Sequence, residues 1–293
     1  MPNADIEFYA SRLRNLEGIY SQLRDPRVKR MANYLEATRS VYFNCFKSML
    51  TNVVAAIIEC RDIYVYQRPL IPHFETFEGT DFFDAKPLIR PMFHCIGLLW
   101  GNSRYFCSVE KLIPLLREVC NLVIQQCTNT IDPNSIFQGE ADEQLLKLRK
   151  AIAILNHFIE TYEMNRDKVH TFFPPGVMPV RWSFDFDRVF MRFNVYMQRL
   201  KMIEDIVAAT VEVLKLEKVE FSGLRGKILS TECLKVLEDY TLEYQHLGNI
   251  TYDPADPEDN SFLADYKKHM GVLQDVDRKL ASLFSQGLEE CND

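Results

Sequence analysis

Apolar residues recur at steps of three and four along most of the chain, and the longest ladder lies between Trp182 and Ser230. This period places side chains on one face of an α-helix. The stretch predicts a helix that ends at the turn from Ser222 to Lys227, where two glycines permit backbone angles closed to other residues. Ser230 or Thr231 is expected to cap the next helix. The ladder consists of Phe186, Phe190, Phe193, Met197, Leu200, Ile203, Val207, Val211 and Leu214.

The same spacing predicts two helices in the first 64 residues. The first covers about residues 5–23. The second begins at Asp25 and Pro26, a good cap and a good first helical residue, and continues to about Tyr64. At about 1.5 Å per residue it would approach 55 Å, a length typical of an extended bundle. Its predicted apolar face contains Val28, Met31, Leu35, Tyr42, Phe46, Met49, Val53, Ile57 and Cys60.

Residues 67–91 interrupt the regular spacing with four prolines and several phenylalanines, so an aromatic loop is expected there rather than a continuous helix. Further helices are predicted from about Pro87, from Ser108, and over residues 143–171, 231–246 and 261–288. The polar stretches 128–142 and 248–260 predict boundaries between three segments, 1–135, 136–250 and 251–293. The predicted fold class is all-α, an elongated array of consecutive helical bundles of irregular α-solenoid type without significant sheet.

Composition narrows the function classes. The chain has 34 basic and 41 acidic residues, a net charge of −7 that disfavours a general nucleic-acid binder. No secretory signal opens it, and the longest apolar runs are far short of the roughly 20 residues that span a membrane, so no membrane association is expected. The cysteines form no CxxC pair and are expected to be reduced thiols that fill the core: Cys45, Cys60, Cys95, Cys107, Cys120, Cys127, Cys233 and Cys291.

The sequence offers little chemistry. No HExxH is present, and the adjacent ligands His94 and Cys95 point about 100° apart on a helix, so no metal is expected. The run from Gly223 to Lys227 differs from a phosphate-binding loop, which needs four residues between its glycines and a preceding strand. No catalytic, cofactor-binding or metal-binding residue is therefore assigned.

Three readings stay open beside this assignment. A distant histidine could still fold beside Ser103, Cys107, Ser108 or Cys233. Asp185 and Asp187 are read as a helix cap rather than as paired catalytic carboxylates. The aromatic cluster Phe172, Phe173, Trp182, Phe184 and Phe186 is read mostly as core, or else as a set of anchors for a partner.

Several motifs together resemble a known family. They are the opening run Asp5 to Tyr9 with Ser11, Arg12, Leu13 and Leu16 to Tyr20; the run Ser40 to Phe43 with Phe46; Leu98 to Trp100 with Ser103 to Phe106; the run Leu214 to Gly226; and Asp275 to Leu280. Over essentially the whole chain, this pattern resembles the N-terminal tail region of dynein heavy chains. The run Leu214 to Gly226 resembles the axonemal heavy chains of the outer-arm β type most.

The resemblance implies a non-catalytic tail, or stem, segment of an axonemal motor for ciliary and flagellar motility. The family's ATP and Mg²⁺ would belong to a motor domain elsewhere in a longer heavy chain. Expected partners are dynein intermediate chains with WD repeats, other dynein heavy chains, light chains and docking factors on axonemal doublet microtubules. The expected location is the cytoplasm, the cytoskeleton and the axoneme of a cilium or flagellum. Alternatives are the tail of a cytoplasmic-type dynein, a generic α-helical adaptor, and a helical enzyme with a site built from distant residues.

Overall fold

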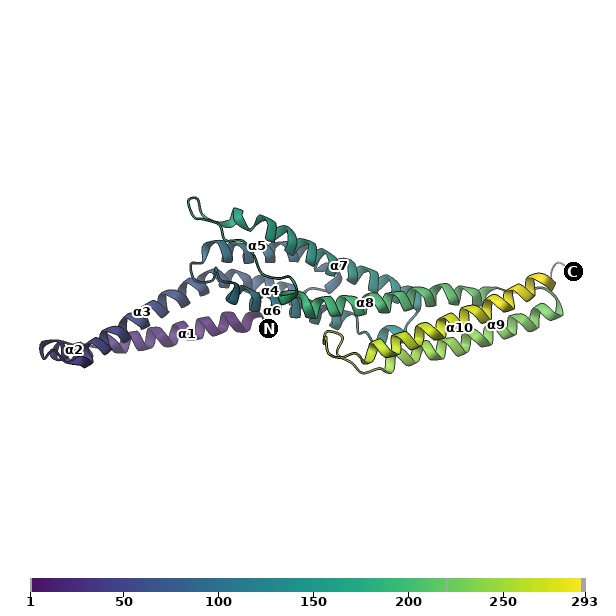
Figure 1. The fold of residues 1–293 in the computed structure, drawn as a ribbon, viewed down its shortest axis with the longest axis horizontal. Helices are drawn as coiled ribbons and strands as arrows, with labels where there is room; N and C mark the ends of the chain where they lie inside the picture. The colour runs from purple at the N-terminus through teal and green to yellow at the C-terminus, as the bar shows by residue number, and fades with distance from the viewer. Residues whose placement is uncertain (1, 220, 291–293) are drawn as a thin grey trace. The chain divides into compact units, whose positions relative to one another are not determined.

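The chain folds into helices joined by short connections (Figure 1), as seen in a computed structural model that describes residues 2–219 and 221–290. Within these residues no β-strand occurs, and the predicted all-α fold class is confirmed. The α-helices are α1 (Pro2–Leu23), α2 (Pro26–Ala37), α3 (Val41–Gln67), α4 (Ile71–Gly79), α5 (Lys86–Asn102), α6 (Val109–Thr130), α7 (Ala141–Lys168), α8 (Asp187–Leu214), α9 (Gly223–His246) and α10 (Ser261–Glu290). The 3-10 turns are η1 (Arg68–Leu70), η2 (Phe82–Asp84), η3 (Ser135–Gln138), η4 (Val169–Phe172), η5 (Lys215–Lys218) and η6 (Leu247–Asn249).

The helices form two compact units, which are described separately. The first unit contains residues 1–122 and 157–189, and the second contains residues 123–156 and 190–293. The division of the chain at residues 135 and 250, expected from its polar stretches, stays a prediction.

An aromatic core holds the first unit together around α5. The ring of Phe93 lies 5.0 Å from that of Phe158, and Tyr162 stacks on Trp182 at 5.6 Å. Trp100 donates its indole N–H to the carbonyl oxygen of Val180 at 2.8 Å. This bond satisfies the polar atom of a fully buried side chain, which would otherwise destabilise the core.

The second unit is built on α8. The predicted ladder is buried there from Phe190 to Val211, with Phe193, Leu200, Ile203 and Val207 almost inaccessible to solvent. Two pairs of hydroxyl groups are hydrogen-bonded inside this core: Thr128 donates to the Tyr196 hydroxyl at 3.1 Å, and the hydroxyls of Thr210 and Tyr240 are 2.6 Å apart. Helix α8 thus behaves as the periodicity indicates.

The predicted single helix from Asp25 to Tyr64 is wrong, because the chain turns between α2 and α3. Thr38 and Arg39 end α2, and Ser40 caps α3 by accepting a hydrogen bond from the Tyr42 amide at 3.4 Å. Arg39 has a φ of 50°, in the left-handed region that favours glycine. The break was missed because no glycine or proline marks it. The cap predicted at Asp25 is confirmed, since its carboxylate accepts from the Arg27 amide at 2.8 Å.

The loop expected over residues 67–91 is also wrong in part. Three of its four prolines, Pro69, Pro72 and Pro87, lie in first turns, where a missing amide donor costs nothing, so the chain forms η1, α4 and the start of α5 instead. The fourth, Pro91, lies inside α5, which continues through it. Phe74, Phe77 and Phe82 are buried in the core of the first unit. The start of a helix near Pro87 is confirmed.

The turn before α9 differs from its prediction. Helix α9 begins at Gly223 itself, whose φ is 83°, whereas Gly226 is an ordinary helical residue. Neither Ser230 nor Thr231 is an N-cap: both lie inside α9, where the Ser230 hydroxyl accepts from the Phe221 amide at 3.1 Å and Thr231 donates to the Lys227 carbonyl. The predicted turn is real, but only its first glycine needs special backbone angles.

Gly226 is required for close packing, and this gives a testable prediction. A Cβ atom at this position would lie 2.8 Å from the backbone carbonyl group of Phe221, too close for any real contact. We expect Gly226→Ala to lower the free energy of unfolding by about 1–3 kcal/mol, because the turn must shift. Gly271→Ala in α10 is the matched control, since a Cβ there meets nothing within 4 Å. It should stabilise the helix by about 1 kcal/mol. Urea unfolding of both variants measures the difference, and equal effects would contradict the packing role.

Candidate interaction surface

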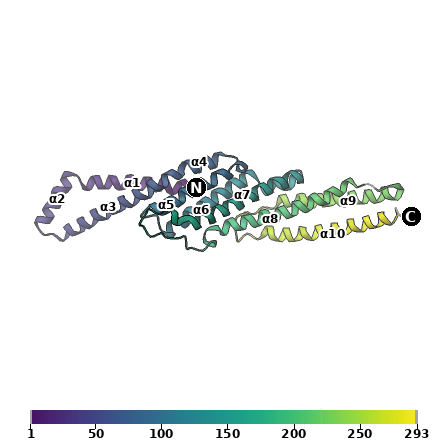
Figure 2. The same ribbon diagram turned by 90° about the horizontal axis from the view of Figure 1, so that it is seen from above.

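Helices α1, α2 and the first half of α3 form a feature that we call the N-terminal arm, residues 2–56. Helix α1 packs along α3, and α2 connects them at the far end (Figures 1 and 2). The arm therefore consists mainly of two paired helices with a third, short helix across the turn.

The arm buries very little of its apolar surface. Among its described side chains, only Ile6 and Ala32 are buried. The face predicted for residues 28–60 is covered at Ile57 and Cys60 but open further out, where Met49 is 46% exposed. Met31 and Tyr42 were expected on a covered face, and this prediction is wrong because no further helix lies over them. The spacing identifies the apolar side of a helix but not whether another element covers it.

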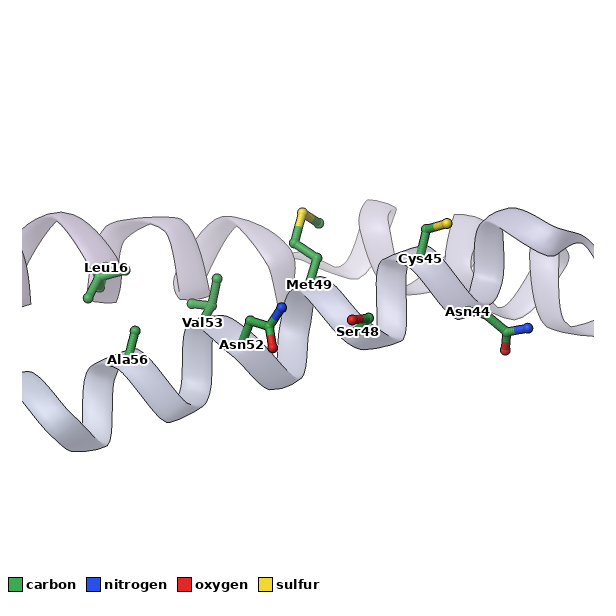
Figure 3. Close-up of a pocket in the computed structure, with 8 residues that line it drawn as sticks. All are labelled: Leu16, Asn44, Cys45, Ser48, Met49, Asn52, Val53 and Ala56. Atoms are coloured by element: carbon green, nitrogen blue, oxygen red, sulfur yellow. The ribbon is translucent and has the colours of Figure 1, made fainter.

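A groove runs along this open face (Figure 3). Its volume is about 720 Å³. Helix α1 contributes one lining residue and α3 the others: Leu16, and Asn44, Cys45, Ser48, Met49, Asn52, Val53 and Ala56. Steps of three and four residues along α3 keep this lining continuous, as in the seam of a helical bundle.

The chemistry of the groove suits an apolar helix. None of the residues that line it is charged, and Leu16, Met49 and Val53 supply aliphatic and thioether surface. Asn44 and Asn52 offer amide groups that can pair with polar side chains of a partner. Such a groove resembles the sites that accept the apolar face of an amphipathic helix.

One helical run in the described chain is long and apolar enough to qualify as a membrane span by length and composition. It covers Val41–Gly79, and its most apolar window has a mean hydropathy of 1.4 with 6% of that window buried. No such segment was expected from the sequence. Residues 41–58 contain a single charged residue, Lys47. Low burial in a helix of this composition indicates an apolar surface without a cover inside the chain.

The serines and cysteines considered as candidate nucleophiles are held in contacts that stabilise the fold. The Ser103 hydroxyl donates to the Asp62 carboxylate at 2.5 Å and accepts from the Phe106 amide at 2.9 Å, which fixes the turn after α5. Burial raises the pKa of the Cys107 and Cys233 thiols, which disfavours the nucleophilic thiolate. Ser108 precedes α6, where its carbonyl accepts the first helical hydrogen bonds.

The aromatic cluster is core only in part, because its four phenylalanines are partly exposed. Trp182 is buried, and Phe172 packs so closely on α5 that a Cβ at Gly97 would meet its ring at 2.5 Å. Asp185 accepts from the Asp187 amide at 3.4 Å, the capping contact expected at the start of α8. These residues therefore position helices of the first unit.

Only some of the cysteines are buried in the core, where all of them were expected. Cys60, Cys120, Cys127 and Cys233 are buried, whereas Cys45 is exposed in the groove, so its prediction as a core residue is wrong. Cys291 and Glu220 lie outside the described residues.

In the part of the chain that the structure describes, no group of three His, Cys, Asp or Glu side chains is placed to hold a metal ion. The run from Gly223 to Lys227 follows the 3-10 turn η5 rather than a strand, unlike a phosphate-binding loop.

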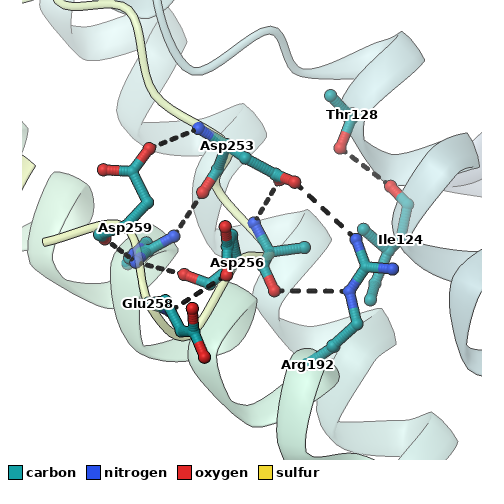
Figure 4. Close-up of polar contacts among 9 residues, drawn as sticks. Ile124, Thr128, Arg192, Asp253, Asp256, Glu258 and Asp259 are labelled. Carbon is teal, nitrogen blue, oxygen red and sulfur yellow. Dashed lines mark hydrogen bonds and ion pairs between the residues drawn. The ribbon is translucent and has the colours of Figure 1, made fainter.

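An acidic loop over residues 253–259 closes around an arginine. The buried Arg199 guanidinium donates to the backbone carbonyl oxygens of Asp253, Asp256 and Asp259, the second of these bonds at 2.7 Å. Figure 4 shows this loop and a second arginine, Arg192, which donates to the Ala255 carbonyl at 3.4 Å. The Arg199 guanidinium is thus the cation that these three carbonyl groups bind.

A polar chain runs through the core of the second unit beside this loop. The Nε2 atom of His269 lies 3.4 Å from the Tyr240 hydroxyl, which contacts Thr210. Burial lowers the pKa of His269 below its ordinary value of 6.5, and the nearby Glu243 carboxylate partly opposes this. The neutral imidazole is therefore the form that the fold accommodates.

Comparison with known proteins decides the family. The sequence profile described as "Dynein heavy chain, N-terminal region 1" matches residues 1–293. The chain belongs to the dynein heavy chain family. It is 34% identical over 290 residues to the ciliary dynein beta chain of Heliocidaris crassispina and 33% identical over 289 residues to human dynein axonemal heavy chain 9, covering 99% of this chain in each case. It is 25% identical over 291 residues to the flagellar outer-arm beta chain of Chlamydomonas reinhardtii.

The chain spans about 6% of the length of these relatives, so it corresponds to the N-terminal region of an axonemal dynein heavy chain and not to its motor domain. The resemblance predicted from the sequence motifs is confirmed. The groove of this dynein segment was missed, although a signal for it exists in the sequence. Residues 41–58 are nearly uncharged on all sides, which is unusual for a helix with one solvated face.

We call the three hydrogen bonds from Arg199 to the loop over residues 253–259 the Arg199 clamp. The clamp predicts that replacing Arg199 destabilises this dynein segment much more than replacing Arg192. We expect Arg199→Lys to lower the free energy of unfolding by about 2 kcal/mol, because an ammonium group cannot donate in a fork to three carbonyl groups. Arg192→Lys is the matched control, because Arg192 is half exposed and should lose less than about 1 kcal/mol. Chemical denaturation measures both, and an equal loss would show that the clamp is not special.

The lowered pKa of His269 predicts that the free energy of unfolding depends on pH. The unfolded chain binds a proton near pH 6.5, whereas the folded chain binds it only at lower pH. Stability is therefore complete above pH 6.5 and falls as the pH decreases through 6.5 towards the folded pKa. Melting temperatures measured between about pH 7.5 and pH 5.5 should decline less steeply in His269→Gln. His246→Gln, at an exposed position of α9, should keep the wild-type slope. A wild-type slope in His269→Gln would exclude this histidine as the source.

Proposed function

We propose that this chain is a non-catalytic stem segment of an axonemal dynein heavy chain, and that it acts as a scaffold in ciliary or flagellar motility. In this proposal it associates with other dynein heavy chains, binds intermediate chains with WD repeats and light chains, and contributes to docking on doublet microtubules through docking factors. It works in the cytoplasm and the axoneme, and ATP and Mg²⁺ act only in the motor domain. The similarity of the chain to ciliary and axonemal dynein chains supports this placement.

The uncovered groove of the N-terminal arm is the observation that carries the proposal. A stable two-helix pair leaves apolar surface on both sides, and a third or fourth helix is the usual way to cover it. Full burial of a side chain such as Met49 or Val53 stabilises a complex by about 1.5–3 kcal/mol. A surface of this kind on a scaffold therefore favours association.

We assign the groove to the N-terminal arm of another dynein heavy chain. Two arms together form a four-helix arrangement in which each open face covers the other. The absence of charge among the lining residues supports an apolar helical partner over a charged one. The same protein partner accounts for the apolar composition of residues 41–58 without a lipid bilayer.

The first test is mutation of the groove. Met49→Glu should abolish or weaken association with the N-terminal segment of a second axonemal heavy chain at least about tenfold, since it places a charge in an apolar seam. Met164→Glu in α7 is the matched control, because Met164 is 44% exposed, almost the same as Met49 at 46%, and lies outside the groove. Sedimentation velocity of mixed segments measures the association. If Met49→Glu associates as the wild type does, the groove is not the site.

A further inference from the structure

A second surface of the arm lies at the turn between α2 and α3. Arg27, Arg30, Met31 and Tyr34 are spaced i, i+3, i+4 and i+7, so they follow one flank of α2. We call these four residues the α2 strip. Met31 is 65% exposed and Tyr34 is 74% exposed, and Ala32 on the opposite flank is the only buried residue of the helix. The strip thus presents two guanidinium groups beside an apolar and an aromatic side chain.

The charge of this region opposes that of the chain. Residues 24–47 contain six basic and two acidic residues, whereas the whole chain has a net charge of −7. In the described structure, Arg27, Arg30 and Arg39 make no ion pair, and Arg30 donates only to the Pro26 carbonyl one turn earlier at 3.3 Å. Basic side chains that cluster without acidic partners create a local positive potential.

Arg39 is an independent sign that this surface is used. It holds the left-handed position of a helix C-terminal turn, in which the Ser40 amide donates to the Leu35 carbonyl at 2.9 Å. Glycine is the common residue at this position, and another residue type costs about 1 kcal/mol. The chain thus has an exposed arginine two residues after the end of α2, at a place where glycine would stabilise the fold. Backbone strain of this kind points to a function for the side chain.

We infer that the α2 strip and Arg39 together bind an acidic protein segment that carries an apolar anchor. Its carboxylates would pair with the guanidinium groups of Arg27, Arg30 and Arg39, and its apolar side chain would pack on Met31 and Tyr34. Guanidinium groups bind carboxylates in a bidentate fork, and aromatic and thioether side chains are frequent anchors at interfaces. The strip shares no residue with the groove, so this inference does not depend on heavy-chain association.

The observations favour a protein over an anionic membrane. The exposed apolar set of α2 is a single methionine and a tyrosine, too little for an interfacial helix, which needs a wide apolar face.

The test uses the whole 293-residue chain and a fluorescent peptide of repeating Glu-Glu-Leu units. Fluorescence anisotropy should show binding that weakens as salt rises. The double variant Arg27→Gln, Arg30→Gln should lose at least about tenfold in affinity. Lys29→Gln is the matched control, because it removes one charge from the other flank of α2 and should change affinity less than about twofold. No binding of the peptide, or equal losses in the double variant and the control, would overturn the inference.

Arg39→Gly separates binding from folding. It should raise the melting temperature, because glycine relieves the left-handed strain, and yet weaken peptide binding several-fold. Met49→Glu should bind the peptide as the wild type does, so loss of heavy-chain association and loss of peptide binding are distinguishable. Vesicles that contain phosphatidylserine are the second probe. Binding of the vesicles without binding of the peptide would replace the acidic protein by a lipid surface and reject the inference.

Discussion

The structure depends on one constraint: the apolar stripe of an amphipathic helix must be covered by another element. In the first unit α5 is surrounded by aromatic side chains from α7 and the segment after it, and in the second unit α8 is covered by α9 and α10. The arm is different, because α1 and α3 cover each other on one side only. Where other elements cover the stripe, a stable core forms, and where cover is incomplete, as in the arm, apolar surface stays exposed.

Sequence periodicity predicted the helices well and their surroundings poorly. Phe193, Ile203 and Met49 occupy equivalent places in their apolar ladders, yet the first two are buried and Met49 is exposed. Periodicity reports the direction in which a side chain points relative to its own helix. Whether another helix lies there depends on contacts between residues far apart in the sequence, which a single sequence does not display. The nearly uncharged run 41–58 indicated an apolar surface, but the sequence did not show that this surface stays uncovered.

Turns were predicted where a special residue marks them and missed where it is absent. Gly223 adopts the positive φ expected of it, but the break at Arg39 uses a residue that does not favour this geometry. The loop over residues 253–259 was expected only as part of a polar boundary, because its contacts with Arg199, more than fifty residues away, cannot be seen in the sequence. In each case a tertiary contact or a strained residue overrides local preference.

The two surfaces of the arm differ in the physics by which they would hold a partner. An uncharged groove gains from removal of apolar area from water, a term that salt scarcely weakens and that depends on close packing. A basic strip with two anchors acts through charge, which speeds encounter and selects a partner but is screened by ions. The two kinds of contact are complementary, since one gains from close packing and the other from charge. Their separation on α1–α3 and on α2 lets each be changed without disturbing the other or the buried cores.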